Sequence, residues 1–364
     1  MAVEGAAMSR GAAQLVRDDI RAMSAYHVAP AAGLVKLDAM ENPYGLPPEL
    51  AREMGERLAA VAVNRYPDPT HAALKASLRE AMSIPESLEV VLGNGSDEIL
   101  QIITVALARP GAAVLSLEPS FAVYKLAATA AAVRYLGVPL REDFTLDEPA
   151  VMAALERERP ALVWIAYPNN PTGNLFPREA ILRIVERAPG LVAVDEAYYA
   201  FSGGATLLPE VGRHPNLVLV RTVSKLGLAG LRLGLAIAPR DWAHELEKLR
   251  MPYNVNVLSA AAAGLVLANR AVLEAQTRAI VAERARLEQA LDAMTAVRRF
   301  PSAANFVLVR VRDAPAAYGR LLERGILVRT LHGSHPLLTN CLRLTVGTPD
   351  ENTRMLDALA RAVD

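Results

Sequence analysis

A lysine with hydroxyl-bearing neighbours follows one of the apolar runs in the middle of the chain. Lys225 is one of only five lysines among 364 residues and ends the segment 221–225, which reads RTVSK. Apolar residues and glycines follow it to Gly230. A lysine in an apolar pocket has a lowered pKa and becomes a nucleophile for carbonyl groups. This context indicates a reactive amine, whereas an isolated lysine would by default be a solvated surface side chain.

Polar groups also follow three other apolar runs that read as strands. In an open parallel sheet, ligands bind beyond the carboxyl ends of the strands, so these ends are expected to meet at one composite site. The polar segments at the four strand ends are Gly93–Asp97, Tyr167–Gly173, Asp195–Tyr198 and Arg221–Lys225.

The residue types at these ends indicate a site for a phosphorylated aldehyde cofactor. The turn 93–96 (GNGS) lets the backbone approach a ligand, and the helix expected after it presents free N–H groups to a phosphate, although many such turns carry two glycines for structural reasons. Asp195 follows a buried run and needs a polar partner there, unless it caps a helix. With Asp195 for a pyridine nitrogen and Lys225 for an aldehyde, the set matches the needs of pyridoxal phosphate.

The segments that must position this site alternate between strands and helices. Continuous apolar strands separated by helices predict an α/β fold with a mainly parallel sheet covered on both faces. The expected strands are 88–92, 113–117, 133–138, 161–166, 191–194, 217–220 and 231–238. The expected helices are 96–108, 120–131, 147–158 and 178–187.

The character of the chain changes after residue 250. A helical stretch at 259–294 is long enough to bridge two domains, and a smaller α/β unit follows it. Its expected strands are 305–311, 326–330 and 342–346, with helices at 314–324 and from 349. We therefore expect three parts, which are an N-terminal arm (1–40) packed on the small domain, a large domain (41–250) and a small domain (251–364).

Composition narrows the class of protein further. Lysine plus arginine and aspartate plus glutamate number 39 each, so no net field attracts nucleic acid or an anionic membrane. The single cysteine, Cys341, excludes a disulfide framework and fits a reducing compartment. No apolar run reaches about 18 residues, and the N-terminal residues lack the apolar core of a signal peptide. We expect a cytoplasmic protein with small-molecule substrates.

The ordered set of motifs carries a family resemblance over nearly the whole chain. The chain resembles the fold-type I pyridoxal-phosphate aminotransferases of the class-II-like group, and among them the histidinol-phosphate aminotransferases. The matching segments are Asp38–Gly45, Arg65–Pro67, Gly95–Glu98, Asn169–Gly173, Asp195–Tyr198, Arg221–Lys225, Gly230–Gly234 and Leu342–Gly347.

The resemblance implies a role for each cofactor-binding residue. Lys225 would bond to the cofactor aldehyde and later carry a proton, and Asp195 would pair with the pyridine nitrogen. Asn170 and Tyr198 would hydrogen-bond the phenolic oxygen, and Phe121 would stack on the ring. The residues implied to hold the phosphate are Gly95, Ser96, Asp97, Thr222, Ser224 and Arg232.

The resemblance also implies substrate contacts and a homodimer. Tyr66 would reach the cofactor phosphate of the neighbouring subunit, and Tyr26 and Asn42 would lie near the substrate. Arg343 would bind a substrate carboxylate or phosphate through its planar fork, with Arg329 on the preceding strand as its partner for phosphate. The implied activity is a ping-pong transamination in L-histidine biosynthesis, in which L-histidinol phosphate and 2-oxoglutarate give 3-(imidazol-4-yl)-2-oxopropyl phosphate and L-glutamate.

Several alternatives remain open at this point. An aromatic or broad-range aminotransferase, or a pyridoxal-phosphate decarboxylase of a phosphorylated amino acid, would use the same fold. A cofactor-binding regulator lacks room for a DNA-binding domain, and a nicotinamide oxidoreductase is disfavoured because position 98 is Glu rather than the third glycine of its fingerprint. The segment from Lys225 to Arg232 is one residue shorter than in many aminotransferases, which leaves the placement of Arg232 open. No metal site is expected, since His332 and His335 have no further ligands nearby.

Overall fold

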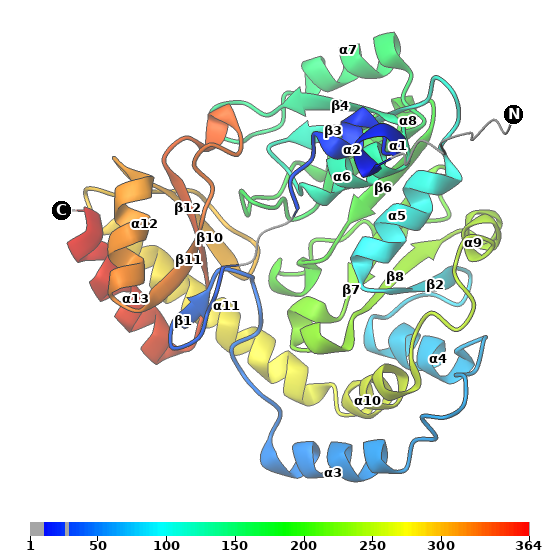
Figure 1. Ribbon diagram of the computed structural model, residues 1–364, viewed down its shortest axis with the longest axis horizontal. Helices are drawn as coiled ribbons and strands as arrows, with labels where there is room; N and C mark the ends of the chain where they lie inside the picture. The colour runs from blue at the N-terminus through cyan, green and yellow to red at the C-terminus, as the bar shows by residue number, and fades with distance from the viewer. Residues whose placement is uncertain (1–10, 26–28, 364) are drawn as a thin grey trace, which may run out of the picture.

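A seven-stranded sheet forms the centre of the larger part of the molecule (Figure 1). The computed structural model describes residues 11–25 and 29–363. The strands are β2 (Glu89–Asn94), β3 (Ala113–Glu118), β4 (Arg134–Pro139), β5 (Leu162–Ala166), β6 (Leu191–Asp195), β7 (Leu217–Thr222) and β8 (Leu233–Ala238). Their order is β2-β8-β7-β6-β5-β3-β4, and only β8 runs antiparallel to its neighbours. The predicted mainly parallel sheet is confirmed.

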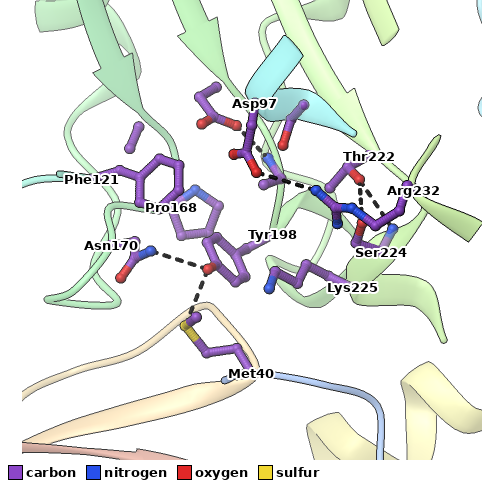
Figure 2. Close-up of a pocket in the computed structure, with 14 residues that line it drawn as sticks. Met40, Asp97, Phe121, Pro168, Asn170, Tyr198, Thr222, Ser224, Lys225 and Arg232 are labelled. Carbon is purple, nitrogen blue, oxygen red and sulfur yellow. Dashed lines mark hydrogen bonds and ion pairs between the residues drawn. The ribbon is translucent and has the colours of Figure 1, made fainter. Parts of the chain in front are cut away.

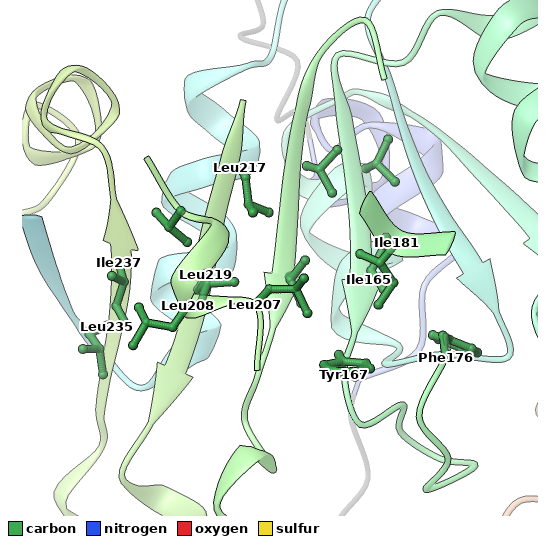
Figure 3. Close-up of a cluster of buried hydrophobic side chains, with 14 of the residues drawn as sticks. Ile165, Tyr167, Phe176, Ile181, Leu207, Leu208, Leu217, Leu219, Leu235 and Ile237 are labelled. Atoms are coloured by element: carbon green, nitrogen blue, oxygen red, sulfur yellow. The ribbon is translucent and has the colours of Figure 1, made fainter. Parts of the chain in front are cut away.

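Both faces of this sheet are apolar because successive side chains of a strand point to opposite faces. In β7, Leu217 and Leu219 belong to one buried cluster and Val218 to another. Figure 3 shows Leu217 and Leu219 in the first cluster together with Ile181. The surrounding helices are α4 (Ala72–Ala81), α5 (Ser96–Ala106), α6 (Val123–Ala130), α7 (Glu148–Glu158), α8 (Arg178–Arg187) and α9 (Arg240–Glu247). Residues of α7 and α8 pack in the first cluster and residues of α5, α6 and α9 in the second, so the sheet is covered on both faces.

A second, five-stranded sheet makes up the smaller part of the molecule. Its order is β1-β11-β12-β10-β9, and its strands are β1 (Val35–Leu37), β9 (Arg298–Arg299), β10 (Phe306–Arg310), β11 (Ile326–Thr330) and β12 (Cys341–Thr345). Helices α12 (Ala314–Glu323) and α13 (Pro349–Val363) accompany it (Figure 1). The short 3-10 turns of the chain are η1 (Tyr199–Phe201), η2 (Leu208–Glu210), η3 (Ser224–Leu226), η4 (Ala229–Leu231) and η5 (Pro336–Leu338).

The N-terminal arm contacts a helix that covers the large sheet as well as a strand of the small sheet. Strand β1 pairs in parallel with β11, which accounts for the predicted contact with the small domain. Before it come α1 (Ala12–Leu15) and α2 (Asp18–Arg21), and α2 lies beside α6, a helix that covers the large sheet (Figure 1). Arg17 donates hydrogen bonds to the carbonyl oxygens of Thr129 and Ala130 at the end of α6. Free carbonyls at a helix C-terminus accept such bonds readily.

The helical stretch expected at 259–294 is two helices rather than one. Helix α10 (Val257–Ala268) and helix α11 (Ala271–Asp292) meet at a bend of 76°. Asn269 ends α10, and its side-chain amide donates to the carbonyl oxygen of Leu265 at 3.0 Å. Helix α10 packs on α4 and on α3 (Pro48–Ala59), whereas α11 contributes buried residues to the core of the small sheet. The division of the chain at residue 250 stays a prediction.

Among the described residues, no single helix has both the length and the hydropathy to cross a membrane; α10 and α11 meet that test only as a pair joined at the bend.

Candidate active site

The polar segments after β5, β6 and β7 meet in one pocket of about 580 Å³, beside the N-terminus of α5 (Figure 2). The shared edge of a parallel sheet brings them together, as predicted. The predicted residues that line this pocket are Ser96, Asp97, Phe121, Asn170, Asp195, Tyr198, Thr222, Ser224, Lys225 and Arg232. Met40, Ala166, Pro168 and Ala197 complete the lining.

Lys225 lies on η3 and extends into this pocket (Figure 2). Its Nζ donates to the carbonyl oxygen of Ala39 at 3.3 Å and lies 5.7 Å from the centre of the Tyr198 ring. Burial, aided by the positive charge of Arg343, lowers the pKa of Lys225 to about 8. A larger share of this amine is therefore neutral and nucleophilic near neutral pH than in an ordinary lysine.

Asp195 is the last residue of β6 and is only 4% exposed. Its two oxygens accept hydrogen bonds from the hydroxyl of Tyr124 at 2.9 Å and from the backbone N–H of Ala197 at 3.0 Å. Burial raises the pKa of Asp195 to about 6, while these two hydrogen bonds act in the opposite direction. A buried carboxylate of this kind gains from a cationic partner such as a protonated pyridine nitrogen.

The turn before α5 and the residues after β7 form an anion cradle. Gly95 has a positive φ of 80°, and a Cβ there would lie 2.6 Å from Nη2 of Arg232. That guanidinium donates to Asp97 at 3.2 Å, so the shortened segment still brings Arg232 to the pocket. The hydroxyls of Thr222 and Ser224 are 2.8 Å apart. Hydroxyls, a guanidinium and a helix N-terminus are the donor set that a phosphate requires.

A chain of hydrogen bonds crosses from the large sheet to the small one. The amide of Asn170 donates to the Tyr198 hydroxyl at 3.2 Å, and this hydroxyl donates to the sulfur of Met40 at 3.2 Å (Figure 2). Arg343 on β12 donates to Oδ1 of Asn170 at 2.7 Å and to the carbonyl oxygen of Asp38 at 2.8 Å. Asn170 and Tyr198, which are expected to bind the phenolic oxygen of the cofactor, are thus linked by hydrogen bonds to Arg343, which is expected to bind the substrate.

The three predicted substrate residues that the structure describes lie in two places. Arg329 and Arg343 are directly opposite each other on β11 and β12, and both line a second pocket that shares Met40, Phe121 and Asn170 with the first. Asn42 lines neither pocket; its amide donates to Oε1 of Gln276 at 2.9 Å and to the carbonyl oxygen of Leu226, next to Lys225.

Of the two other predicted tyrosines, the structure describes Tyr66, which lines neither pocket. Tyr66 is 80% exposed, and its ring stacks on that of Tyr253 with 4.5 Å between the centroids. Tyr26 lies outside the described residues.

Sequence reasoning missed two features that hold the site together. The first is Tyr124, which is fully buried and stacks on Trp164 at 5.1 Å while donating to Asp195. The second is the ion pair of Arg221 and Glu196, 2% and 0% exposed, with Nη2 and Oε2 2.8 Å apart. The pair joins the residue after Asp195 to the residue before Thr222. Its sequence signal is a charge directly at the end of each buried strand, since such charges need partners.

The residues of the pocket fit pyridoxal phosphate. The cradle around Gly95 suits a phosphate, the buried Asp195 suits a pyridinium, and Lys225 with its lowered pKa suits an aldehyde. Phe121 lines the same pocket and offers an aromatic face. Among the described residues, no group of His, Cys, Asp and Glu side chains is arranged to hold a metal ion.

Comparisons with known proteins agree with this geometry. The family model for aminotransferase class I and II matches residues 32–359, and the chain belongs to that family. It is 55% identical to the histidinol-phosphate aminotransferase of Chromobacterium violaceum over 348 residues, covering 96% of this chain and 98% of the relative.

Solved structures point the same way. The histidinol-phosphate aminotransferase of Sinorhizobium meliloti, in complex with pyridoxal-5'-phosphate, matches with a TM-score of 0.85 and 26% identity over 98% of each chain. An L-threonine-O-3-phosphate decarboxylase from Porphyromonas gingivalis matches with a TM-score of 0.76 and 25% identity, covering 89% of this chain and 98% of that one. The fold is that of fold-type I aminotransferases, as the sequence resemblance implied.

Proposed function

We propose that the chain is a pyridoxal-phosphate-dependent histidinol-phosphate aminotransferase. It interconverts L-histidinol phosphate and 2-oxoglutarate with 3-(imidazol-4-yl)-2-oxopropyl phosphate and L-glutamate in L-histidine biosynthesis. The observation that carries the proposal is the single pocket in which Lys225, Asp195 and the anion cradle meet. The 55% identity to a curated enzyme of that name supports the choice of substrate.

The cofactor supplies an aldehyde that exchanges amino groups and a ring that accepts electrons when its nitrogen is protonated. Lys225 would bind the aldehyde of the cofactor and would carry a proton at the substrate Cα, which its lowered pKa allows near neutral pH. The Asp195 carboxylate keeps the ring nitrogen protonated, and Tyr124 and the Ala197 N–H keep that carboxylate in place. Asn170 and Tyr198 orient the phenolic oxygen.

The other residues of the cradle anchor the cofactor. Ser96, Thr222, Ser224 and Arg232 would donate to the phosphate, and the N-terminus of α5 would contribute its free N–H groups. Phe121 lines the same pocket and would stack on the ring. These contacts fix the reacting carbon beside Lys225, so that the orientation does not have to be found in each turnover.

Arg329 and Arg343 select the substrate. A phosphate dianion is well matched by two guanidinium groups, each of which offers a planar fork of donors. The same Arg343 binds the carboxylate of 2-oxoglutarate in the second half-reaction. Tyr26 and Asn42 complete the substrate side of this proposal.

A homodimer in the cytoplasm completes the proposal. Tyr66, Tyr253, Val63 and Met251 are strongly or partly exposed apolar side chains, and Tyr66 stacks on Tyr253. Exposed aromatic pairs are typical of protein interfaces. In the proposed dimer, Tyr66 would contact the cofactor phosphate in the site of the other subunit. The buried, unpaired thiol of Cys341 is consistent with a reducing compartment.

A second candidate is a decarboxylase of a phosphorylated amino acid, favoured by the likeness to the threonine-phosphate decarboxylase. The deciding experiment is a side-by-side assay of L-histidinol phosphate, L-phenylalanine and L-phosphothreonine with 2-oxoglutarate. We expect glutamate formation from histidinol phosphate at the highest kcat/KM. Equal turnover of phenylalanine would make the chain a general aromatic aminotransferase, and release of carbon dioxide from phosphothreonine would make it a decarboxylase.

A covalent-labelling experiment tests the cofactor assignment. Borohydride reduction of the holoenzyme should fix the cofactor on the peptide that contains Lys225. Lys225→Ala should abolish turnover while the phosphate cradle still binds the cofactor. A label on Lys36, Lys75, Lys125 or Lys248 would contradict the assignment.

A further inference from the structure

The second pocket contains an acidic and a histidine side chain that the proposed mechanism does not use. Besides Arg329 and Arg343, Glu118 at the end of β3 and His335 just before η5 line it. Lys125 lines it as well, so the pocket offers three cationic side chains and one carboxylate. Apolar contacts around them come from Phe121, Pro171, Leu331 and Leu338.

The Glu118 carboxylate is held over a glycine of the neighbouring strand. A Cβ at Gly137 of β4 would lie 2.9 Å from Cγ of Glu118 and would overlap its carboxyl group, so only glycine leaves this space open. Burial and the adjacent Glu118 carboxylate raise the pKa of Tyr135, which keeps this phenol neutral and able to donate to Glu118. The Glu118 side chain is 30% exposed and therefore remains within reach of a ligand.

His335 faces the carboxylate without bonding to it. Its Nδ1 accepts the backbone N–H of Leu337 at 3.2 Å, which places the proton of the neutral ring on Nε2. Nε2 lies 3.9 Å from Oε2 of Glu118, longer than a hydrogen bond. Glu118 thus keeps acceptor capacity that the histidine does not use.

We propose that Glu118 binds the imidazole ring of the substrate, with Gly137 and Tyr135 positioning its carboxylate and His335 beside it. This inference rests on the proposed function, because that substrate has a phosphate at one end and an imidazole at the other. The arginine pair matches the first end, and a carboxylate matches an imidazole N–H in either protonation state. A phenyl ring has no such donor and would leave the remaining acceptor capacity of the partly desolvated Glu118 unfilled, so phenylalanine-like substrates are disfavoured.

The test compares two phosphate esters that differ only in the ring. L-histidinol phosphate and L-phenylalaninol phosphate are assayed with the wild-type holoenzyme and with Glu118→Ala, Glu118→Gln and Gly137→Ala. Glu156→Gln, an exposed glutamate of α7, is the matched control. The glutamate half-reaction and cofactor content of each variant report on folding and on the rest of the site.

We expect Glu118→Ala to lower kcat/KM for histidinol phosphate on the order of tenfold to a hundredfold, the range for losing a hydrogen bond to a charged group. The phenyl ester and the glutamate half-reaction should change less than about threefold, well below that range. Gly137→Ala should lose the same preference for histidinol phosphate, because its Cβ displaces the Glu118 carboxylate. The kcat/KM of Glu118→Gln should lie between those of the wild type and Glu118→Ala, since the amide oxygen can still accept a hydrogen bond.

Two further outcomes separate the two proposals. Equal losses for both esters, or no loss for either, would overturn the imidazole subsite while leaving the proposed function intact. A wild-type enzyme that turns over neither ester would overturn the proposed function, and the subsite with it.

Discussion

The hydroxyl of Tyr124 donates a 2.9 Å hydrogen bond to Oδ2 of Asp195, although the two residues are 71 positions apart in the chain. Tyr124 is fixed in turn by its stacking on Trp164. A donor to the charged form of a carboxylate lowers its pKa, so this contact opposes the effect of burial on Asp195.

Removing this donor should change both the rate and its pH dependence. In Tyr124→Phe, the pKa of Asp195 rises above its present value of about 6, so the ionised form needed beside the ring nitrogen is lost at a higher pH. The acidic limb of the kcat profile should therefore move to higher pH, and kcat at pH 7 should fall about tenfold, the scale of a hydrogen bond to a charged group. Tyr318→Phe, in α12 of the small domain, is the control. An unchanged acidic limb would contradict the role of Tyr124.

The lowered pKa of Lys225 predicts when the apoprotein captures its cofactor. Only the neutral amine attacks an aldehyde, so the rate of covalent capture should rise with pH and level off above about 8 rather than above 10.5. Because the charge of Arg343 contributes to this shift, Arg343→Gln should move the midpoint to higher pH. Stopped-flow absorbance on mixing apoprotein with pyridoxal phosphate measures the pH dependence of capture in the wild-type protein and in the variant. A midpoint near that of free lysine would show that the amine is not perturbed.

The exposed position of Tyr66 predicts complementation between subunits. Lys225→Ala and Tyr66→Phe proteins are mixed and allowed to exchange subunits. If Tyr66 acts in the neighbouring site, the heterodimer has one site with both defects and one with neither. Activity should then exceed that of either protein alone. If activity does not increase after subunit exchange has been demonstrated, Tyr66 acts within its own subunit or has no role in the site.

The facing arginines of β11 and β12 predict a phosphate-specific loss. Arg329→Ala should weaken kcat/KM for L-histidinol phosphate by about 2 kcal/mol, or some thirtyfold, since a charge-assisted hydrogen bond contributes roughly 1.5–3 kcal/mol. Unphosphorylated L-histidinol has no group for this guanidinium and should be turned over as before. The informative measurement is the ratio of the two rates in variant and parent. If the ratio is the same in the variant and the parent, Arg329 does not bind the substrate phosphate.

The pocket lining could be predicted from sequence because each of its polar segments follows a continuous apolar run. Strand ends in a parallel sheet share an edge, so Asp195 and Lys225 had to be neighbours once both runs were strands. The bounds of α8 and β11 also agree, since Pro177 and Gly325 punctuate their starts. These features depend on the local sequence pattern and on the parallel sheet that the alternation of strands and helices predicts.

Other features depend on which surfaces meet, and sequence patterns do not contain that information. Tyr124 lies on an apolar helix face like any core aromatic, and only the folded chain reveals its acceptor. The break between α10 and α11 has no proline or glycine, so the pattern there continued as one helix. The contact of α2 with α6 and the proximity of Glu118 to His335 are likewise products of tertiary packing.

Arg343 donates hydrogen bonds to Asn170 and to the carbonyl oxygen of Asp38. In the proposed ping-pong cycle, a substrate anion must take over part of this guanidinium, and each departing product must give it back. Substrate binding then exchanges one set of hydrogen bonds for another, which limits the affinity for the phosphate substrate and for the carboxylate substrate. Such internal competition favours product release between the two half-reactions and lets one arginine serve a phosphate and a carboxylate in alternation.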